Sequence, residues 1–262
     1  MTDTEDRSRK IVRGVSVPSL GMGTWRLSGD PCREAVELAL DVGYRHIDTA
    51  RMYGNEKEVG AGINNSGVDR EDIFLTTKLW TDTFTREKAV AAGRDSVEKL
   101  RTGYVDLLLM HWPNPDVPVE ETVTAMRELQ DKGLVRHIGV SNFSEGQMEE
   151  AARYGEIFCN QIRYNTEENR SGLLEQARKL DYLVTAYTPI SKGRTNDDAT
   201  LREIASGYGK SPTQIALRWL VQQEKVSAIP KATGRAHLEE NFDIFDFELS
   251  EKEMNRIFAL AG

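Results

Sequence analysis

Four side chains of types that handle protons fall at or near the ends of three apolar, strand-like segments. Asp48 lies near the end of the first segment and Tyr53 follows it by five residues, while Lys78 and His111 lie near the ends of the next two. A lysine within an apolar strand is costly to bury unless it is paired, and Asp48 on the neighbouring strand is the obvious partner. We therefore expect a carboxylate, an ammonium, a phenol and an imidazole to meet on one face of the molecule.

Together these four groups form a proton donor. A free phenol has a pKa of about 10 and is a weak acid at neutral pH. A nearby ammonium favours the phenolate, so Lys78 is expected to lower the pKa of Tyr53. Asp48 keeps Lys78 charged, and His111 can hold a substrate oxygen or stabilise charge that develops on it. The set suits reversible protonation of a carbonyl oxygen, and because it supplies no electrons, a cofactor has to donate the hydride.

The segments that must position these residues alternate with amphipathic helical segments along the chain. Between the first two strand-like segments, PCREAVELALDVG (31–43) places apolar residues at helical spacing. This alternation is typical of parallel strands joined by crossover helices. The eight strand-like segments are residues 19–25, 46–50, 73–80, 105–112, 137–143, 159–165, 183–190 and 226–232.

Eight such units predict an α/β fold, the (β/α)8 TIM barrel, as a single domain over residues 11–262. Residues 1–10 are expected to form a flexible, charged N-terminal arm. In this barrel, the C-terminal ends of the strands and the loops after them form the active-site face. An open doubly wound sheet is the alternative fold, and it would normally carry a G-x-G-x-x-G turn after its first strand. The nearest match, GMGTWR (21–26), lacks the third glycine and weighs against that alternative.

Several helix starts are marked in the sequence. Asp30 before Pro31 predicts an N-cap followed by a proline in the first helical position. Ser211 and Ser250 each begin an S-x-x-E/Q pattern, which predicts a capping box at the start of each helix.

Charge and cysteine content limit the classes of function. The net charge is −8, from 34 basic and 42 acidic residues, which makes nucleic acid or an anionic membrane a poor partner. No apolar run approaches the roughly 18–20 residues of a membrane span, and the charged start is unlike a secretory signal. Cys32 and Cys159 lack CxxC spacing, so we expect reduced thiols in a cytoplasmic protein. The four histidines have no metal-binding spacing, and no metal is expected.

Six longer motifs occur in order along the chain and contain most of the residues named above. They are GYRHIDTARMYGNEKEVG (43–60), LTTKLW (75–80), LLLMHWP (107–113), IGVSNF (138–143), AYTPI (186–190) and IPKATGRAHLEENF (229–242). They resemble the aldo-keto reductase family over roughly residues 11–258, in particular short prokaryotic-type members such as aldehyde and 2,5-diketogluconate reductases. The resemblance implies the same barrel, and a nicotinamide cofactor bound without a Rossmann domain.

The catalytic tetrad of the family falls on Asp48, Tyr53, Lys78 and His111, all four intact. The resemblance implies that Tyr53 is the general acid that protonates the carbonyl oxygen as hydride reaches the carbon. Lys78 and Asp48 would tune this acid, and His111 would orient the carbonyl. The implied activity is reduction of aldehyde and ketone carbonyls to alcohols by an NAD(P)-dependent oxidoreductase.

The resemblance also implies the residues that bind the nicotinamide half of the cofactor. Ser141, Asn142 and Gln161 would hold the carboxamide, and Tyr187 would stack on the ring.

The rest of the cofactor is expected to meet residues from other parts of the chain. Gly23 and Thr24 would lie beside it at the first strand, and Ser191 falls in the pyrophosphate-binding loop, which is short here. Glu240 and Asn241 match the pair that contacts the adenine.

Three tryptophans end or follow strands at the expected site. Trp25, Trp80 and Trp112 resemble the aromatic substrate walls of the family, although core packing is the alternative for any one of them. The chain lacks a long C-terminal extension, so the pocket is expected to be open and to accept a range of small carbonyl or alcohol substrates. The resemblance also implies a monomer.

The motif near the end of the chain departs from the family pattern where NADP carries its 2′-phosphate. Lys231 is kept, but Ala232 replaces the usual serine and His237 replaces the usual arginine. A phosphate would then lie near Lys231, Thr233 and Arg235, with Arg235 supplying the lost charge. We expect NADP(H) to be preferred, with NAD(H) also used.

Three other classes of protein are alternatives to this interpretation. Tyr53 and Lys57 match the Y-x-x-x-K of short-chain dehydrogenases, but the glycine-rich turn of that family is absent. A lyase could use Lys78 to form a Schiff base, yet Asp48 should keep the lysine protonated and a poor nucleophile. A regulatory protein that binds cofactor without catalysis is the third, and the intact tetrad argues against it.

Overall fold

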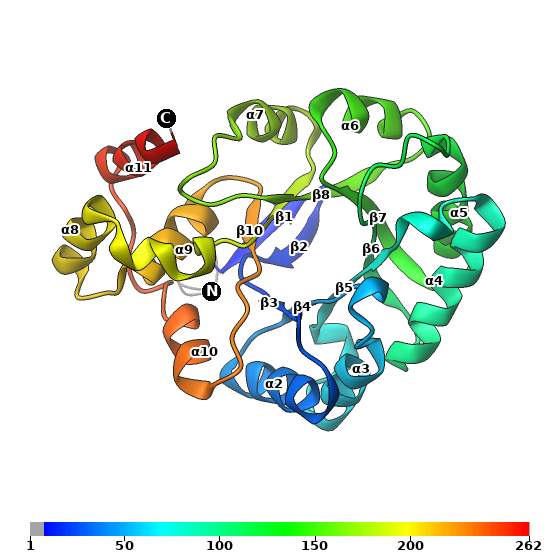
Figure 1. The fold of residues 1–262 in the computed structure, drawn as a ribbon, viewed down its shortest axis with the longest axis horizontal. Coiled ribbons are helices and arrows are strands. Elements are labelled where there is room, and N and C mark those ends of the chain that lie inside the picture. Colours follow the sequence, from blue (N-terminus) through cyan, green and yellow to red (C-terminus); the bar gives the residue numbers. More distant parts are fainter. Residues whose placement is uncertain (1–7, 262) are drawn as a thin grey trace.

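The computed structural model describes residues 8–261, and in it eight parallel strands form a closed ring. Their order in the sheet is β10-β9-β8-β7-β6-β5-β4-β3. A parallel bridge from Leu20, just before β3, to Ala228 of β10 closes the barrel. Figure 1 shows the strands around a central axis with the helices outside them. The strands are β3 (Met22–Gly23), β4 (His46–Asp48), β5 (Phe74–Leu79), β6 (Val105–Met110), β7 (Val135–Ser141), β8 (Ile157–Arg163), β9 (Leu183–Tyr187) and β10 (Val226–Ala228).

Helices connect successive strands and cover the outer surface of the barrel. The α-helices are α2 (Gly29–Val42), α3 (Glu56–Asn65), α4 (Arg86–Leu100), α5 (Val119–Asp131), α6 (Glu145–Ala152), α7 (Ser171–Leu180), α8 (Ala199–Tyr208), α9 (Pro212–Gln222), α10 (Arg235–Phe242) and α11 (Glu251–Phe258). The short 3-10 helices are η1 (Arg51–Tyr53), η2 (Arg70–Asp72), η3 (Thr81–Thr83), η4 (Ser191–Asp197) and η5 (Ala259–Ala261). Apolar side chains of these helices and of the outward-facing strand positions form the main core.

A two-stranded hairpin that the sequence patterns did not predict closes the N-terminal end of the barrel. Strand β1 (Arg9–Val12) pairs antiparallel with β2 (Val15–Pro18). Val12 and Val17 of the hairpin are fully buried and pack in a small inner cluster with residues such as Phe74 and Leu183, which begin β5 and β9. The hairpin lies behind the centre of the ring in Figure 1. The opposite end, where the strands finish, is left for the functional site.

The eight expected strands are all present and in the expected order, although each ends earlier than predicted. Trp80, His111 and Trp112 lie in loops just after β5 and β6 rather than within them. The first strand is shortest, because only Met22 and Gly23 pair with β4. The glycine permits a close approach: a Cβ at Gly23 would lie 2.9 Å from the carbonyl oxygen of Ile229.

The predicted helix starts had mixed outcomes. Capping boxes are present at Ser211 and Ser250, which confirms both predictions. The predicted N-cap at Asp30 is wrong: Ser28 is the N-cap of α2, and the Asp30 carboxylate instead contacts the Arg33 guanidinium at 3.4 Å. The expected N-terminal arm overlaps β1, which begins at Arg9, while its first seven residues lie outside the described part of the chain.

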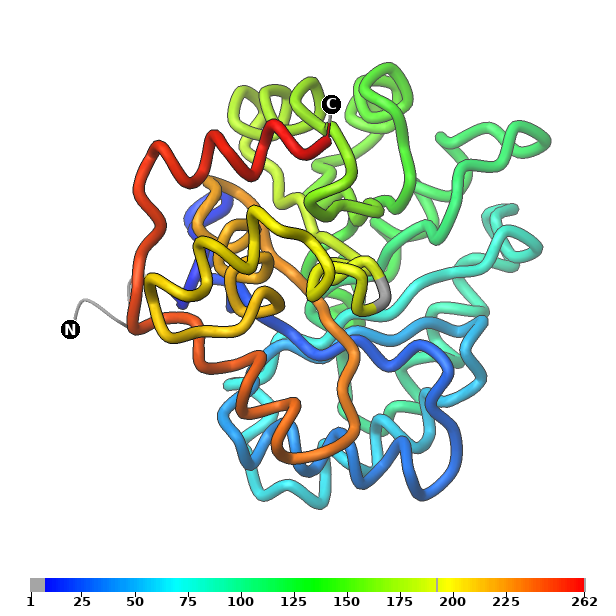
Figure 2. Tube along the Cα trace, turned by 60° about the vertical axis from the view of Figure 1, so that its left-hand side comes forward, coloured from blue at the N-terminus to red at the C-terminus, as the bar shows by residue number. Residues whose placement is uncertain are grey.

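The C-terminal helix packs outside the barrel wall. Figure 2 shows α11 (red) passing beside α8 (yellow), where Arg256 Nη2 lies 2.7 Å from Glu203 Oε2. Within residues 8–261, no helix is both long and apolar enough to cross a membrane.

Candidate active site

A fully buried ion pair lies at the C-terminal rim of the barrel. The Lys78 side chain of β5 is 0% exposed, and its Nζ lies 2.5 Å from Oδ1 of Asp48 on the neighbouring strand β4. Lys78 Nζ also donates to the carbonyl oxygen of Thr49 at 2.8 Å. Burial alone would lower the pKa of Lys78, but Asp48 and Tyr53 outweigh burial and raise it. Lys78 is therefore charged at neutral pH, which makes it a poor nucleophile for Schiff-base chemistry.

The second carboxylate oxygen of Asp48 is also occupied. Gln161 Nε2 donates to Asp48 Oδ2 at 2.7 Å. Gln161 lies on β8, which is not a neighbour of β4 in the sheet, so this bond crosses the interior of the barrel. Both residues are only 2% exposed. Asp48 is thus held from two sides, and its orientation toward Lys78 is fixed.

The phenol of Tyr53 lies at the edge of this pair. Lys78 Nζ is 3.5 Å from Tyr53 Oη. Burial raises the pKa of Tyr53, and Lys78 opposes that rise without reversing it. The expectation that Lys78 would lower the pKa below its usual value is therefore wrong for the net shift, because it left out the cost of forming a phenolate in a buried site. Tyr53 holds its proton at neutral pH, as a proton donor must.

His111 completes the group of four as a neutral imidazole. Its ring centroid lies 5.7 Å from that of Tyr53, edge to face. Burial and the nearby Lys78 lower the pKa of His111 to about 3. Its buried Nδ1 has no hydrogen-bond partner among the described residues. A neutral ring that carries one N–H can donate to a substrate oxygen without adding charge.

Acidification should destabilise the fold partly through His111. Its folded-state pKa of about 3 lies below the unfolded value near 6.5, so the unfolded chain binds the extra proton between these values. Stability should therefore fall by about 1.4 kcal/mol per pH unit below 6.5 on account of this group. In denaturant titrations at pH 5–7, His111→Asn should lose that part of the slope, whereas His237→Gln, at a largely exposed position, should keep it. An unchanged slope in His111→Asn would contradict the neutral, buried imidazole.

Two of the three tryptophans expected at the site contact the group of four. The Trp25 ring centroid lies 4.8 Å from that of Tyr53, and the Trp80 ring stands edge to face against His111 at 5.1 Å. Trp25 and Trp112 are 45% and 44% exposed. Exposure of this extent rules out simple core packing for these two, and it suits walls of an open pocket.

The residues expected at the nicotinamide lie close together on the rim. Ser141 Oγ donates to the Gln161 carbonyl oxygen at 2.8 Å, and Asn142 Nδ2 lies 3.0 Å from Ser141 Oγ. Tyr187 Oη donates to Asn142 Oδ1 at 2.8 Å. Asn142 adopts a left-handed backbone with φ 64°, a conformation that asparagine tolerates better than most residues. One hydrogen-bonded chain thus connects β7, β8 and β9 beside the tetrad.

Two hydroxyl groups in the loop after β9 lack partners. Ser191 Oγ and Thr195 Oγ1 are buried and have no hydrogen-bond partner among the described residues. An acceptor-rich group such as a pyrophosphate would satisfy both donors, so the loop fits the expected cofactor. Ser191 was predicted here, whereas Thr195 was missed, because a threonine in a short loop carries no signal of its own. Gly23 ends β3, which the Leu20–Ala228 bridge places beside β10. Thr24 follows it and donates from Oγ1 to the Asp48 carbonyl oxygen at 3.0 Å.

The residues expected at the adenosine end lie on or just before α10. Arg235 does not stand free: its Nη2 lies 2.5 Å from Asp41 Oδ2 of α2, and its Nη1 lies 3.3 Å from Glu239. His237 is 78% exposed, 3.7 Å from Glu240. The basic region therefore has acidic neighbours that the sequence analysis missed, because Asp41 is nearly 200 residues away in the chain.

The other members of this end differ in exposure. Lys231 and Thr233 are exposed, Glu240 is half-buried and Asn241 is buried.

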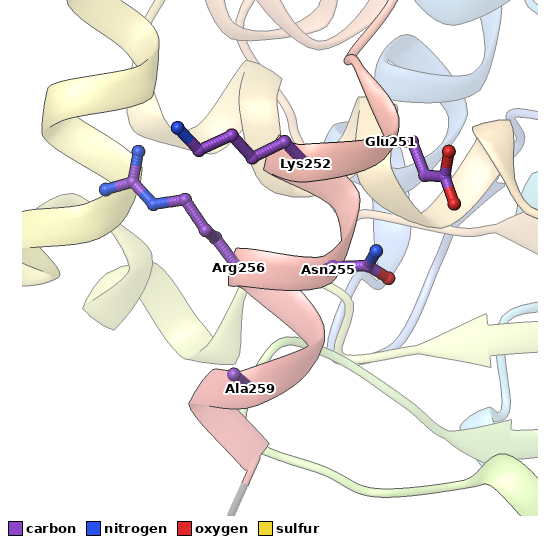
Figure 3. A pocket seen from close by; sticks show the side chains of 5 residues that line it. All are labelled: Glu251, Lys252, Asn255, Arg256 and Ala259. Carbon is purple, nitrogen blue, oxygen red and sulfur yellow. The ribbon is translucent and has the colours of Figure 1, made fainter.

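A surface hollow elsewhere on the molecule holds none of these groups. It has a volume of about 580 Å³ and lies along α11, lined by Glu251, Lys252, Asn255, Arg256 and Ala259. In Figure 3, Lys252 and Arg256 extend to one side of the helix and Glu251 and Asn255 to the other, so no polar groups converge. We therefore assign the functional site to the barrel rim. No group of three or more His, Cys, Asp and Glu side chains within residues 8–261 is arranged to hold a metal ion.

The chain matches known proteins over almost its full length. Residues 19–261 match the model of the aldo/keto reductase family. Glyoxal reductase of Bacillus subtilis (strain 168) is 38% identical over 254 residues, which are 96% of this chain and 91% of that protein. Methylglyoxal reductase DkgB of Escherichia coli O157:H7 is 37% identical over 251 residues, 94% of each chain.

A solved structure agrees in fold. The crystal structure of a Bombyx mori aldo-keto reductase in complex with NADP superposes with a TM-score of 0.89 at 36% identity, and covers 96% of this chain and 92% of that one. The long family match, the level of identity and the shared barrel support the same family assignment. The chain belongs to the aldo/keto reductase family and is an oxidoreductase that acts on carbonyl groups.

Proposed function

We propose that this protein reduces aldehyde and ketone carbonyls with Tyr53 as the general acid. The observation that carries the proposal is the position of Lys78 Nζ, fully buried, 2.5 Å from Asp48 Oδ1 and 3.5 Å from Tyr53 Oη. A buried cation beside a phenol stabilises the phenolate that remains after the proton has left. Asp48 in turn compensates the buried charge of Lys78.

Each of the four side chains has a separate role in the transfer of one proton. The raised pKa of Tyr53 keeps the phenol protonated until charge develops on a carbonyl oxygen beside it. The proton then passes from Tyr53 Oη to that oxygen, and Lys78 offsets the charge left behind. His111, neutral because its pKa is lowered to about 3, donates a hydrogen bond that orients the carbonyl. A reduced nicotinamide bound beside the tetrad would supply the hydride.

The chain offers residues to hold such a cofactor along the rim. Ser141, Asn142 and Gln161 would bind the nicotinamide carboxamide, and Tyr187 would stack on the ring. Support comes from the hydrogen-bonded chain that already joins these residues. The unpartnered hydroxyls of Ser191 and Thr195 would bind the pyrophosphate.

The proposed substrates are small aldehydes and dicarbonyls. Support comes from the open mouth, where Trp25 and Trp112 are 45% and 44% exposed, and from the relatives, which are a glyoxal reductase and a methylglyoxal reductase. Aromatic walls of this kind contact small apolar groups without fixing their shape. Steady-state kinetics with glyoxal, methylglyoxal, aromatic aldehydes and bulky ketones test the proposal. Higher kcat/KM for bulky ketones than for dicarbonyls would contradict it.

For the cofactor we propose a modest NADPH preference, with NADH also accepted. Lys231 and Arg235 supply positive charge for a 2′-phosphate, but Arg235 is already paired with Asp41 and Glu239. A phosphate would have to compete with these carboxylates, and this competition limits the preference.

Replacing His237 with arginine should strengthen that preference. The new guanidinium would add a charge-assisted contact to the phosphate, worth about 1.5 kcal/mol, or roughly tenfold in the Kd of NADPH. Titration of cofactor binding by protein fluorescence measures the effect, with NADH as the matched control because it lacks the phosphate. Equal tightening of both cofactors, or none of either, would show that position 237 does not face the 2′-phosphate.

We also propose that the protein works in the cytoplasm as a monomer. Both cysteines are free and buried, as expected of a protein kept in a reducing compartment.

A further inference from the structure

Asn55 is a buried asparagine whose side chain joins its own loop to two other segments, the turn at residues 24–27 and Thr49 after β4. It is 0% exposed and follows Tyr53 by two residues. Its Oδ1 accepts from Thr49 Oγ1 at 2.7 Å. Its Nδ2 donates to the carbonyl oxygens of Thr24 and Leu27 at 3.0 and 2.9 Å. These bonds satisfy both donors and an acceptor of the amide in a place closed to water.

The position of Asn55 makes this use unusual. It is the N-cap residue of α3, where an asparagine side chain normally accepts from the backbone of the first turn. Here the side chain makes no capping hydrogen bond. A typical side-chain cap of this kind contributes about 1 kcal/mol to stability. Asn55 does not make this contribution, because its side chain bonds to Thr24, Leu27 and Thr49 instead. The hydrogen bonds of the Asn55 side chain therefore hold neighbouring loops together and do not cap α3.

The partners of Asn55 hold two parts of the proposed acid site. Thr49, which donates to Asn55, also presents the carbonyl oxygen that accepts from Lys78 Nζ at 2.8 Å. Thr24 and Leu27 enclose the turn that carries Trp25, whose ring centroid lies 4.8 Å from that of Tyr53. This turn has its own backbone bond from Leu27 N to Thr24 O at 3.1 Å. The turn can therefore form without Asn55, which adds the attachment of the turn to the loop of Tyr53.

We propose that Asn55 is a positioning residue that sets the spacing between the Trp25 wall and the Tyr53 phenol and holds the second acceptor of Lys78. This inference rests on the proposed role of Tyr53 as the acid. A substrate must lie between the wall and the phenol, so a change in their spacing alters both the binding and the protonation of the carbonyl. Misplacement of about 1 Å at a reacting group can cost about 100-fold in rate.

The test is Asn55→Asp, which keeps the shape but replaces the donor Nδ2 with a carboxylate oxygen that faces the carbonyl oxygens of Thr24 and Leu27. The expected result is a loss of about 10- to 100-fold in kcat/KM for methylglyoxal, with KM raised and kcat lowered, measured well below the melting temperature. Tryptophan emission should shift, and Trp25→Phe should remove that shift. Asn55→Ala removes the side-chain hydrogen bonds without adding charge. If the aspartate variant does not fold, Asn55→Ala should likewise lower kcat/KM, with KM raised and kcat lowered.

Gln223→Glu is the matched control. Gln223 is a buried amide away from the rim that likewise accepts from a hydroxyl, Tyr164 Oη at 2.8 Å, and donates to a carbonyl, Trp219 O at 3.0 Å. It should lower stability and leave kcat/KM unchanged.

A double variant of Asn55 and Trp25 distinguishes a positioning role of Asn55 from a general contribution to stability. In a Trp25→Ala background, Asn55→Asp should change KM by less than twofold, because the wall that it positions is gone. A variant with a lowered melting temperature but wild-type kcat/KM would overturn the inference, as would full additivity with Trp25→Ala or an equal loss in Gln223→Glu. Failure of the wild-type protein to reduce any carbonyl would instead count against the proposed function itself.

Discussion

Lys78→Met is expected to abolish carbonyl reduction and to lower the free energy of unfolding by about 3–5 kcal/mol. Methionine matches the length of the lysine stem but removes the ammonium. The Asp48 carboxylate is 2% exposed. Of its side-chain partners in the described part of the chain, it then keeps only Gln161 and becomes a buried charge without a counterion there. The phenolate of Tyr53 also loses the cation that stabilises it, so the loss of activity and the loss of stability share one cause.

Denaturant unfolding and steady-state kinetics on the same preparations measure both effects. Lys57→Met is the matched control, because Lys57 is exposed on α3 and belongs to the Y-x-x-x-K pattern of the rival family. It should behave as the wild type in both assays. Adding Asp48→Asn to Lys78→Met should recover part of the stability and none of the activity. If Lys57→Met rather than Lys78→Met were inactive, the assignment of the acid site would be wrong.

Tyr53→Phe is expected to lower kcat by about 10²–10⁴-fold while leaving the fold intact. Among residues 8–261, the phenol hydroxyl has one hydrogen-bond partner, Lys78 Nζ at the long distance of 3.5 Å, so its removal costs little structure. The ring that faces Trp25 and His111 is kept, and cofactor binding should be retained.

Tyr164→Phe is a suitable control for the loss of a buried tyrosine hydroxyl. Its Oη donates to Gln223 at 2.8 Å, away from the rim. This variant should lose some stability and keep its kcat. A Tyr53→Phe protein with wild-type kcat would exclude the phenol as the proton donor.

The barrel and the pairing of Asp48 with Lys78 could be predicted because each rests on local patterns. Strand-like segments that alternate with amphipathic helices define the (β/α)8 order without knowledge of contacts. Parallel strands then bring their C-terminal ends to one rim, and Asp48 and Lys78 had to meet there because β4 and β5 are neighbours.

The features that were missed depend on contacts between distant segments or on the cost of burial. The first strand of the β1–β2 hairpin begins within the residues expected to form a charged arm, and only the inner cluster around Val12 and Val17 shows why the hairpin folds. The bond from Gln161 to Asp48 crosses the barrel, which no sequence pattern reports. The pKa of Tyr53 was expected to fall, because the nearby Lys78 was visible in the sequence and the extent of burial was not.

The central claim is that this site reduces carbonyls through the phenol of Tyr53, and one measurement tests it most directly. Reduced nicotinamide absorbance is followed with methylglyoxal and a panel of aldehydes, with NADPH and NADH in parallel, for the wild type and Tyr53→Phe. We predict turnover by the wild type, faster with NADPH, that falls at least about 100-fold in the variant. Cofactor binding without turnover of any carbonyl by the wild type would contradict it.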